Sequence, residues 1–196
     1  EEKWNDIKII IEYGMLSEDK FFEKSDSFSI YPDTNNNFYT FDELIKNIEK
    51  SQTDKDGKTI ILYASNVDEQ DSYIKAAESK GYKVLLLDSP IVPHLIQKLE
   101  SKKENISFAR VDSDSIDNLI KKEDNIISKL DDKEKDKLKN YIEAVVPKEK
   151  YTIQLEALDS KELPFIITQP EFMRRMKDMQ QSGGNNMFGS MPELHN

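Results

Sequence analysis

Three short segments rich in large apolar residues constrain the fold of this 196-residue chain more than any other feature of its sequence. They are residues 59–64 (TIILYA), 83–88 (KVLLLD) and 106–111 (ISFARV). Near-continuous apolar runs of this length are typical of strands that are covered on both faces. Residues 68–80 and 93–100, which lie between them, have helical patterns. Strands that alternate with helices in this way predict β-α-β units on a mostly parallel sheet, which is an α/β fold.

Helical patterns also precede the first of these strands. Residues 1–13 place four large apolar side chains at helical spacing: Trp4, Ile7, Ile10 and Ile11. We expect Gly14 to end this helix, because glycine is common just after a helix end. Residues 32–37 consist of types that favour turns and predict a loop. Thr40 and Glu43 then have the spacing of a capping box, so a helix is expected to begin after Thr40.

The composition changes after Asp112, where charged residues become dense and large apolar residues become sparse. Residues 112–150 are expected to form helices with solvated faces and i,i+4 ion pairs, as mixed charge runs usually do. Residues 151–158 (YTIQLEAL) alternate in polarity, and residues 164–168 (PFIIT) form another apolar run, so both are predicted to be strands. With a covering helix, these strands predict a small α+β unit beyond a domain boundary near Asp112.

Charge and cysteine content exclude several classes of protein. The chain has 28 Lys and Arg against 38 Asp and Glu, a net charge of −10, so we expect neither a nucleic acid nor a membrane as a partner. No apolar run approaches the roughly 18 residues of a membrane-spanning helix, and the chain opens Glu-Glu-Lys-Trp, without a signal-like start. The absence of cysteine excludes disulfides and thiolate sites and favours a cytoplasmic location.

The connections between strands and helices lack the residues of nucleotide or metal chemistry. A phosphate site after the first strand requires glycine, whereas residues 65–71 (SNVDEQD) have none and contain three carboxylates. Asp68, Asp71 and Asp88 could form an acidic cluster, but in a chain with 38 acidic residues helix capping and solvation are the favoured interpretation. We therefore expect no catalytic, cofactor-binding or metal-binding residues.

A methionine-rich segment near the carboxyl end is the strongest functional signal. Thr168 and Glu171 form a second capping-box pattern, with Pro170 inside the first turn, so a helix is expected to begin there. Arg174 and Arg175 are among the polar residues of this helix. Its apolar face is formed by Phe172, Met173, Met176 and Met179.

A methionine stripe at helical spacing is ordinarily part of a core, and from the stripe alone that interpretation stays open. Two observations favour an exposed surface. The region offers little apolar surface to receive the helix, and the polar, glycine-containing residues 180–186 (QQSGGNN) follow it in place of another packed element. Methionine side chains are unbranched and polarizable, so they can repack against many shapes, as a surface for varied protein partners requires.

The order and spacing of several segments resemble the ninety-kilodalton heat-shock chaperone family in its bacterial form. The segments are Lys3–Asp6 with Tyr13 and Gly14, Tyr39–Leu44, Thr59–Ala64, Glu78–Asp88 and Pro164–Met179. The likeness covers essentially the whole chain and is closest over residues 39–111. It implies the helical connector of a middle domain over residues 1–37, its small α/β subdomain over 38–112, and a partial C-terminal domain over 113–196.

The resemblance implies that the parent protein is an ATP-dependent chaperone. ATP and Mg²⁺ would bind to an N-terminal domain upstream, and a helix pair downstream would form the homodimer, so this chain itself is expected to be neither an ATPase nor a stable dimer. Its expected partners are unfolded or partly folded client proteins. The client-contacting positions of the family correspond here to His94, Gln97, Phe172, Met173, Met176 and Met179. Bacterial relatives often carry Trp where this chain has His94. The histidine therefore reduces the apolar area expected at this position.

Two other functions remain open at this point. The first is a small-molecule enzyme that uses the strand ends of the α/β region, which a ligand-induced rise in thermal stability would reveal. The second is a structural spacer whose methionine face packs against a neighbouring domain. Hydrogen-exchange protection of residues 170–181 would favour the spacer, and rapid exchange there would favour a client-binding surface.

Overall fold

The computed structural model describes residues 3–120, 128–147, 150–157 and 164–182. Contacts within the chain define two units. The first comprises residues 1–122 and 165–183, and the second comprises residues 123–164 and 184–196. The predicted α/β region and the methionine-rich helix therefore lie in the same unit.

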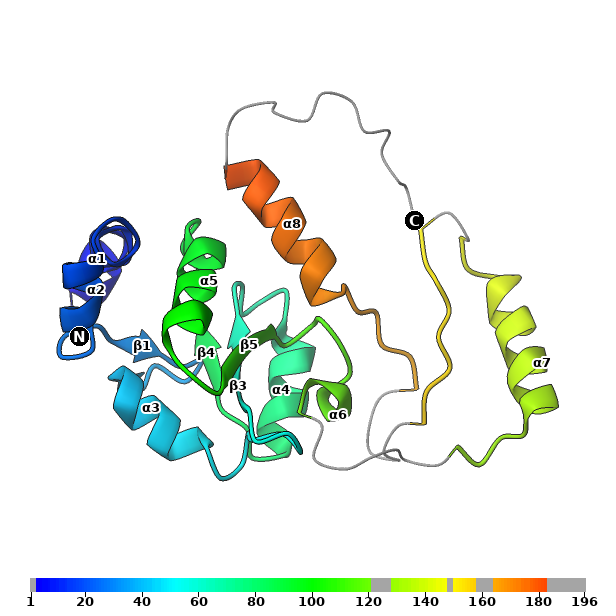
Figure 1. Cartoon of the computed structure of the whole chain (residues 1–196). Helices are drawn as coiled ribbons and strands as arrows, with labels where there is room; N and C mark the ends of the chain where they lie inside the picture. The colour runs from blue at the N-terminus through cyan, green and yellow to red at the C-terminus, as the bar shows by residue number, and fades with distance from the viewer. Residues whose placement is uncertain (1–2, 121–127, 148–149, 158–163, 183–196) are drawn as a thin grey trace. The chain divides into compact units, whose positions relative to one another are not determined.

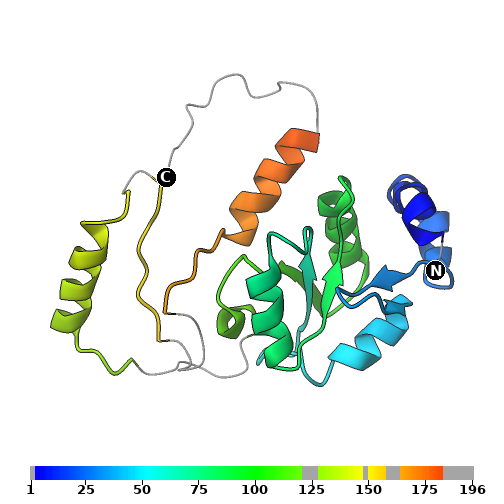
Figure 2. The same ribbon diagram turned by 180° about the vertical axis from the view of Figure 1, so that it is seen from behind.

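A three-stranded parallel sheet forms the centre of the first unit. Its strands are β3 (Thr59–Ala64), β4 (Val84–Leu86) and β5 (Ile106–Arg110), in the order β4-β3-β5. Helix α4 (Asp71–Ser79) connects β3 to β4, and α5 (Val92–Lys102) connects β4 to β5. The two helices lie on opposite faces of the sheet (Figures 1 and 2). The α/β fold predicted from the three apolar runs is confirmed.

Every residue of the central strand β3 is buried, because β3 is paired on both edges and covered on both faces. Ile61 and Tyr63 belong to a core that includes residues of α1, α2, α3 and α5. Ile60 and Leu62 belong to a second core, with residues of α4 and α6 (Ile116–Leu119). Successive strand residues point to opposite faces, so a strand between two cores must be apolar at nearly every position.

Two helices and a short hairpin precede the sheet. They are α1 (Trp4–Ser17), α2 (Asp19–Ser25) and the antiparallel pair β1 (Tyr31–Pro32) and β2 (Phe38–Tyr39). Helix α3 (Phe41–Ile48) then begins with the predicted capping box. The Glu43 carboxylate accepts the backbone N–H of Thr40 at 2.9 Å, and the Thr40 hydroxyl accepts the backbone N–H of Glu43 at 3.4 Å.

Gly14 lies inside α1 and does not end it, so the prediction of a helix end at this position was wrong. The helix continues to Ser17. A Cβ atom at Gly14 would lie 2.9 Å from ring atom Cε1 of Phe21 on α2. A side chain at this position would force the Phe21 ring of the neighbouring helix to shift, a close approach that spacing along the sequence could not reveal.

The segments beyond β5 differ more from expectation. The described parts of the two predicted strands, residues 151–157 and 164–168, contain no strand and pair with no other described strand. In the second unit, α7 (Asp132–Glu143) begins with a capping box of Asp131 and Glu134. Residues 121–127, within the predicted helical stripe, lie outside the described residues.

A buried carboxylate connects α1 to the loop after β4. Glu12 is 7% exposed and accepts a hydrogen bond from the Ser89 hydroxyl. Burial raises the pKa of Glu12, and this effect outweighs the lowering by the Ser89 hydrogen bond and by nearby Lys8. The ionised form of this side chain is therefore disfavoured in the folded protein.

We predict that Glu12→Gln stabilises the fold at neutral pH. A carboxyl group whose pKa is raised by folding contributes stability below its unfolded pKa and loses that contribution as pH rises through its folded pKa. Glutamine keeps a hydrogen-bond acceptor for Ser89 without the charge. The variant should unfold at higher urea concentration than wild type at pH 7, and the difference should shrink toward pH 4. The exposed control Glu23→Gln should show no such trend; the same trend in both variants would contradict the prediction.

Candidate functional site

Helix α8 (Glu171–Ser182) attaches to the first unit through charged side chains. Arg174 is 4% exposed, and its guanidinium lies over the ring of Tyr63, 5.5 Å from the ring centroid. Its Nη2 donates hydrogen bonds to the Tyr63 hydroxyl and, at 2.5 Å, to the Glu171 carboxylate. Because Tyr63 lies on β3, this arginine attaches α8 to the central strand of the sheet.

Arg175 connects α8 to its two other neighbours, α5 and β5. Its Nη1 lies 2.8 Å from the carboxylate of Glu100 on α5. Its Nη2 donates to the backbone carbonyl of Phe108 on β5 at 2.7 Å, and its Nε donates to Glu171 at 2.6 Å. We call Glu100, Glu171, Arg174 and Arg175 the charged cluster. Figures 1 and 2 show α8 beside α5 and β5.

The ionised state of the charged cluster is favoured by its own members. Burial by itself would raise the pKa of Glu171, but the charge of Arg174 and the hydrogen bonds from both arginines outweigh burial and lower it. Burial likewise opposes the charge of Arg175, yet Glu100 and Glu171 raise its pKa above the usual range. Glu171 is therefore ionised at neutral pH while it is largely enclosed.

The apolar face of α8 points away from these contacts. Phe172 is 72% exposed, Met173 58% and Met176 45%. An amphipathic helix ordinarily buries its apolar stripe and solvates its polar face; in α8 a buried arginine replaces the apolar anchor. We call Phe172, Met173 and Met176 the apolar ridge. Met179 lies in the same helix, but its side chain is outside the described part of the chain.

The other two predicted site residues lie on α5, the helix that Glu100 joins to α8. His94 is half-buried and Gln97 is exposed. A cavity of about 330 Å³ is lined by Val92 and Pro93 at the beginning of α5 and by Arg174 of α8. The structure thus brings the predicted sites, far apart in the sequence, onto neighbouring helices.

The start of α8 differs from the predicted capping box. The helix begins at Glu171, and the backbone N–H of Arg174 donates to the carbonyl of Pro170, so the proline lies before the helix. The carboxylate of Glu171 binds Arg174, Arg175 and the backbone N–H of Arg110, at 3.3 Å in the last case. The i,i+3 and i,i+4 spacing of Glu171 with the arginines was a signal for local ion pairs, but nothing in the sequence identified their distant partners.

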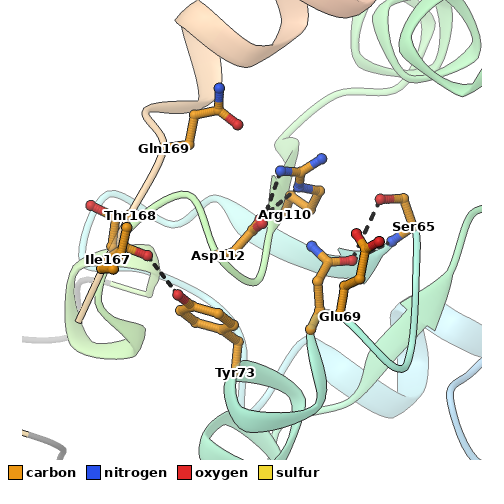
Figure 3. Close-up of a pocket in the computed structure, with 9 residues that line it drawn as sticks. Ser65, Glu69, Tyr73, Arg110, Asp112, Ile167, Thr168 and Gln169 are labelled. Carbon is orange, nitrogen blue, oxygen red and sulfur yellow. Dashed lines mark hydrogen bonds and ion pairs between the residues drawn. The ribbon is translucent and has the colours of Figure 1, made fainter. Parts of the chain in front are cut away.

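The carboxyl ends of β3 and β5 border a polar cavity of about 300 Å³ (Figure 3). Arg110 and Asp112 form a two-pronged ion pair there, with distances of 2.6 and 2.8 Å. The Tyr73 hydroxyl donates to the carbonyl of Ile167 at 2.6 Å. Because the arginine is already neutralised by Asp112, and Glu69 adds another carboxylate to the lining, the site is poorly suited to phosphate.

Two of the three acidic residues considered as a possible cluster, Asp71 and Asp88, bind separate lysines. Asp88 lies 2.5 Å from Lys8, and Asp71 lies 2.7 Å from Lys75. Among the described residues, no group of three or more His, Asp or Glu side chains is arranged to hold a metal ion. A search of the same residues found no helix that is both long and apolar enough to cross a membrane.

Curated bacterial proteins match the chain over its whole length. It is 45% identical to the chaperone protein HtpG of Bacteroides thetaiotaomicron, 44% to that of Bacteroides fragilis and 42% to that of Porphyromonas gingivalis. Each match covers 100% of this chain and 29% of the relative. The chain thus spans less than a third of the length of these relatives.

Comparisons with protein-family models and with solved structures do not contribute to the family assignment. No protein-family model matches the chain. The middle domain of a Plasmodium falciparum heat shock protein matches 57% of this chain and 47% of its own, with 14% identity and a TM-score of 0.42, a likeness too low to carry an argument. The assignment therefore rests on the bacterial relatives: at 42–45% identity over its entire length, the chain belongs to the HtpG family of heat-shock chaperones, as the counterpart of one segment of those proteins.

Proposed function

We propose that this chain is a client-binding segment of an HtpG-type chaperone and that the apolar ridge of α8 contacts partly folded proteins. The observation that carries the proposal is the orientation of α8. Its charged side is enclosed against β3, α5 and β5, and three large apolar side chains are left exposed. Exposed apolar surface of this kind marks sites of protein interaction.

The charged cluster fixes α8 against the sheet, and the apolar side chains of the ridge stay exposed. Covering a methionine or phenylalanine side chain contributes about 1.5–3 kcal/mol. That free energy remains available to a partner when a helix is anchored by hydrogen bonds and ion pairs instead. Methionine adapts to many surface shapes, so Met173, Met176 and, with them, Met179 suit clients of varied sequence.

His94 and Gln97 of α5 belong to the proposed surface as flanking contacts. The half-buried His94 and the exposed Gln97 lie on the helix that Glu100 connects to α8. Both are polar, so their contribution is expected to be smaller than that of the ridge.

The remaining properties of the parent protein are proposed from its family. We infer that it binds ATP and Mg²⁺ through a domain outside this chain, hydrolyses ATP there, forms a homodimer and acts in the cytoplasm. The parts of the chain would be a helical connector over residues 1–37, a small α/β subdomain over 38–112 and part of a C-terminal domain over 113–196. Nucleic acids and membranes are not expected as partners of a chain with a net charge of −10.

The orientation of α8 also changes which test separates a client surface from a spacer. A helix attached through its charged side can be protected from hydrogen exchange while its ridge stays exposed, so protection of residues 170–181 does not identify a spacer. Accessibility of the ridge to a partner has to be measured directly.

We predict that replacing Met173 and Met176 by serine weakens client binding roughly tenfold or more. Each side chain is about half exposed, so a client that covers it gains about half of the full burial value, roughly 0.75–1.5 kcal/mol for each methionine. The probe is a reduced and alkylated, permanently unfolded protein, and binding is measured by fluorescence anisotropy. Binding to wild type should persist at high salt, since apolar contacts are not screened. Lys177→Ser, an exposed change on the same helix, is the matched control and should bind like wild type. Unaltered affinity in the methionine variant, with circular dichroism unchanged, would contradict the assignment of the ridge.

We also predict that docking of α8 weakens in acid. The folded pKa of Glu171 is lowered, so its contribution to stability is present above the unfolded pKa of about 4.3 and is lost as pH falls through the folded value. At pH 7, Glu171→Gln should weaken docking by about 1–3 kcal/mol, measured by hydrogen exchange of α8. The difference from wild type should diminish below about pH 4. Glu104→Gln, an exposed control, should have no effect; a pH-independent effect of Glu171→Gln would refute this role.

A further inference from the structure

Strand β5 lies at the edge of the sheet. It pairs with β3 on one side, and among the described strands it has no neighbour on the other. The backbone N–H of Thr59 donates to the carbonyl of Asn105, and the N–H of Val111 donates to the carbonyl of Tyr63. Odd-numbered residues of this stretch therefore turn their backbone groups toward β3, and even-numbered residues turn theirs toward the outer edge.

Charged side chains occupy three of these outward backbone groups. The Phe108 N–H donates to the Glu100 carboxylate at 2.7 Å, and the Phe108 carbonyl accepts from Arg175 at 2.7 Å. The Arg110 N–H donates to the Glu171 carboxylate at 3.3 Å. These donors and acceptors recur every second residue, the arrangement that an adjacent strand would use.

The cover of this edge is a single connected group of side chains on two helices. Arg175 binds Glu100 of α5 at 2.8 Å and Glu171 of its own helix at 2.6 Å. Glu171 and Arg175 both belong to α8, whose described apolar side chains point outward. Movement of α8 away from the sheet would therefore uncover the Phe108 carbonyl and the Arg110 N–H together.

We propose that the outer edge of β5 is a covered binding site for an extended polypeptide segment, which adds to the sheet as a further strand when α8 moves away. Addition of a strand to a sheet edge recognises backbone groups, so it accepts many sequences. Charged side chains on an edge are a known protection against unwanted strand pairing.

An unfolded polypeptide is the favoured occupant over a second copy of this chain. Two copies could pair through β5 only if α8 had moved away in both at once. An extended polypeptide already has free backbone groups, so one opening suffices. The site is distinct from the apolar ridge, and the inference does not depend on the function proposed for that ridge.

The test uses a variant of the chain in which the cover is weakened, Glu171→Ala with Arg175→Ala. The probe is a blocked peptide of alternating threonine and valine flanked by lysines. Two new backbone hydrogen bonds, to the Phe108 carbonyl and the Arg110 N–H, at about 0.5–1.5 kcal/mol each should make its binding at least about fivefold tighter than to wild type. The same peptide, N-methylated at alternate residues so that one edge lacks donors, should bind no better than to wild type. Lys177→Ala should behave like wild type.

Hydrogen exchange locates the effect. In the variant the amide of Arg110 should exchange faster, because Glu171 no longer accepts it, while the Phe108 amide keeps Glu100 and the amides of β3 stay protected. The peptide should restore protection at residue 110. Arg175→Met, which removes the ion pairs but keeps an apolar stem, gives a milder second variant should the first lose its fold. Adding Met173→Ser and Met176→Ser to either variant should leave peptide binding unchanged.

Several outcomes would overturn the inference. An Arg110 amide that stays protected when Glu171 and Arg175 are both alanine would show that these side chains are not its cover. Exposed amides without peptide binding, or equal binding of the N-methylated peptide, would exclude a strand-binding edge. Concentration-dependent self-association without peptide would make a second copy the occupant. Loss of peptide binding with the methionine changes would place the peptide on the ridge.

Discussion

The arrangement of the first unit depends on the central strand β3, which is paired on both edges and buried on both faces. Its alternating side chains supply two cores, one with α1, α2, α3 and α5 and one with α4 and α6. Tyr63 adds a further role, because its ring packs in the first core while its hydroxyl binds Arg174 of α8. The same strand thus organises the core and receives the helix that carries the proposed client surface.

The attachment of α8 has a directional character that apolar packing lacks. Hydrophobic burial is proportional to area and largely indifferent to orientation, whereas Arg174 and Arg175 need particular acceptors on Tyr63, Glu171, Glu100 and the Phe108 carbonyl. Buried ion pairs add little net stability, because desolvation offsets their attraction. What this cluster supplies is a defined orientation, with the charged side inward and the ridge outward.

Two surfaces suited to polypeptide are therefore connected through one helix. The ridge of α8 is open, and the edge of β5 is covered by side chains of α8 and by Glu100. Arg175 contributes to both arrangements, since it helps hold the ridge outward and also occupies a backbone carbonyl of β5. Docking of α8 thus presents one proposed surface and closes the other.

The sequence by itself determined the α/β fold, the capping box of α3 and the existence of α8, because apolar periodicity and local hydrogen-bond partners are properties of nearby residues. It also identified the apolar face of α8 and the chaperone family. Only the tertiary structure decided that Gly14 lies against Phe21, that residues 151–157 and 164–168 form no strand, and that α8 docks through Arg174. Each of these depends on a partner distant in the chain: a ring, a neighbouring strand, or the hydroxyl of a tyrosine 111 positions away. Local pattern shows which faces a helix has, but which face is buried is decided by what the rest of the fold places beside it.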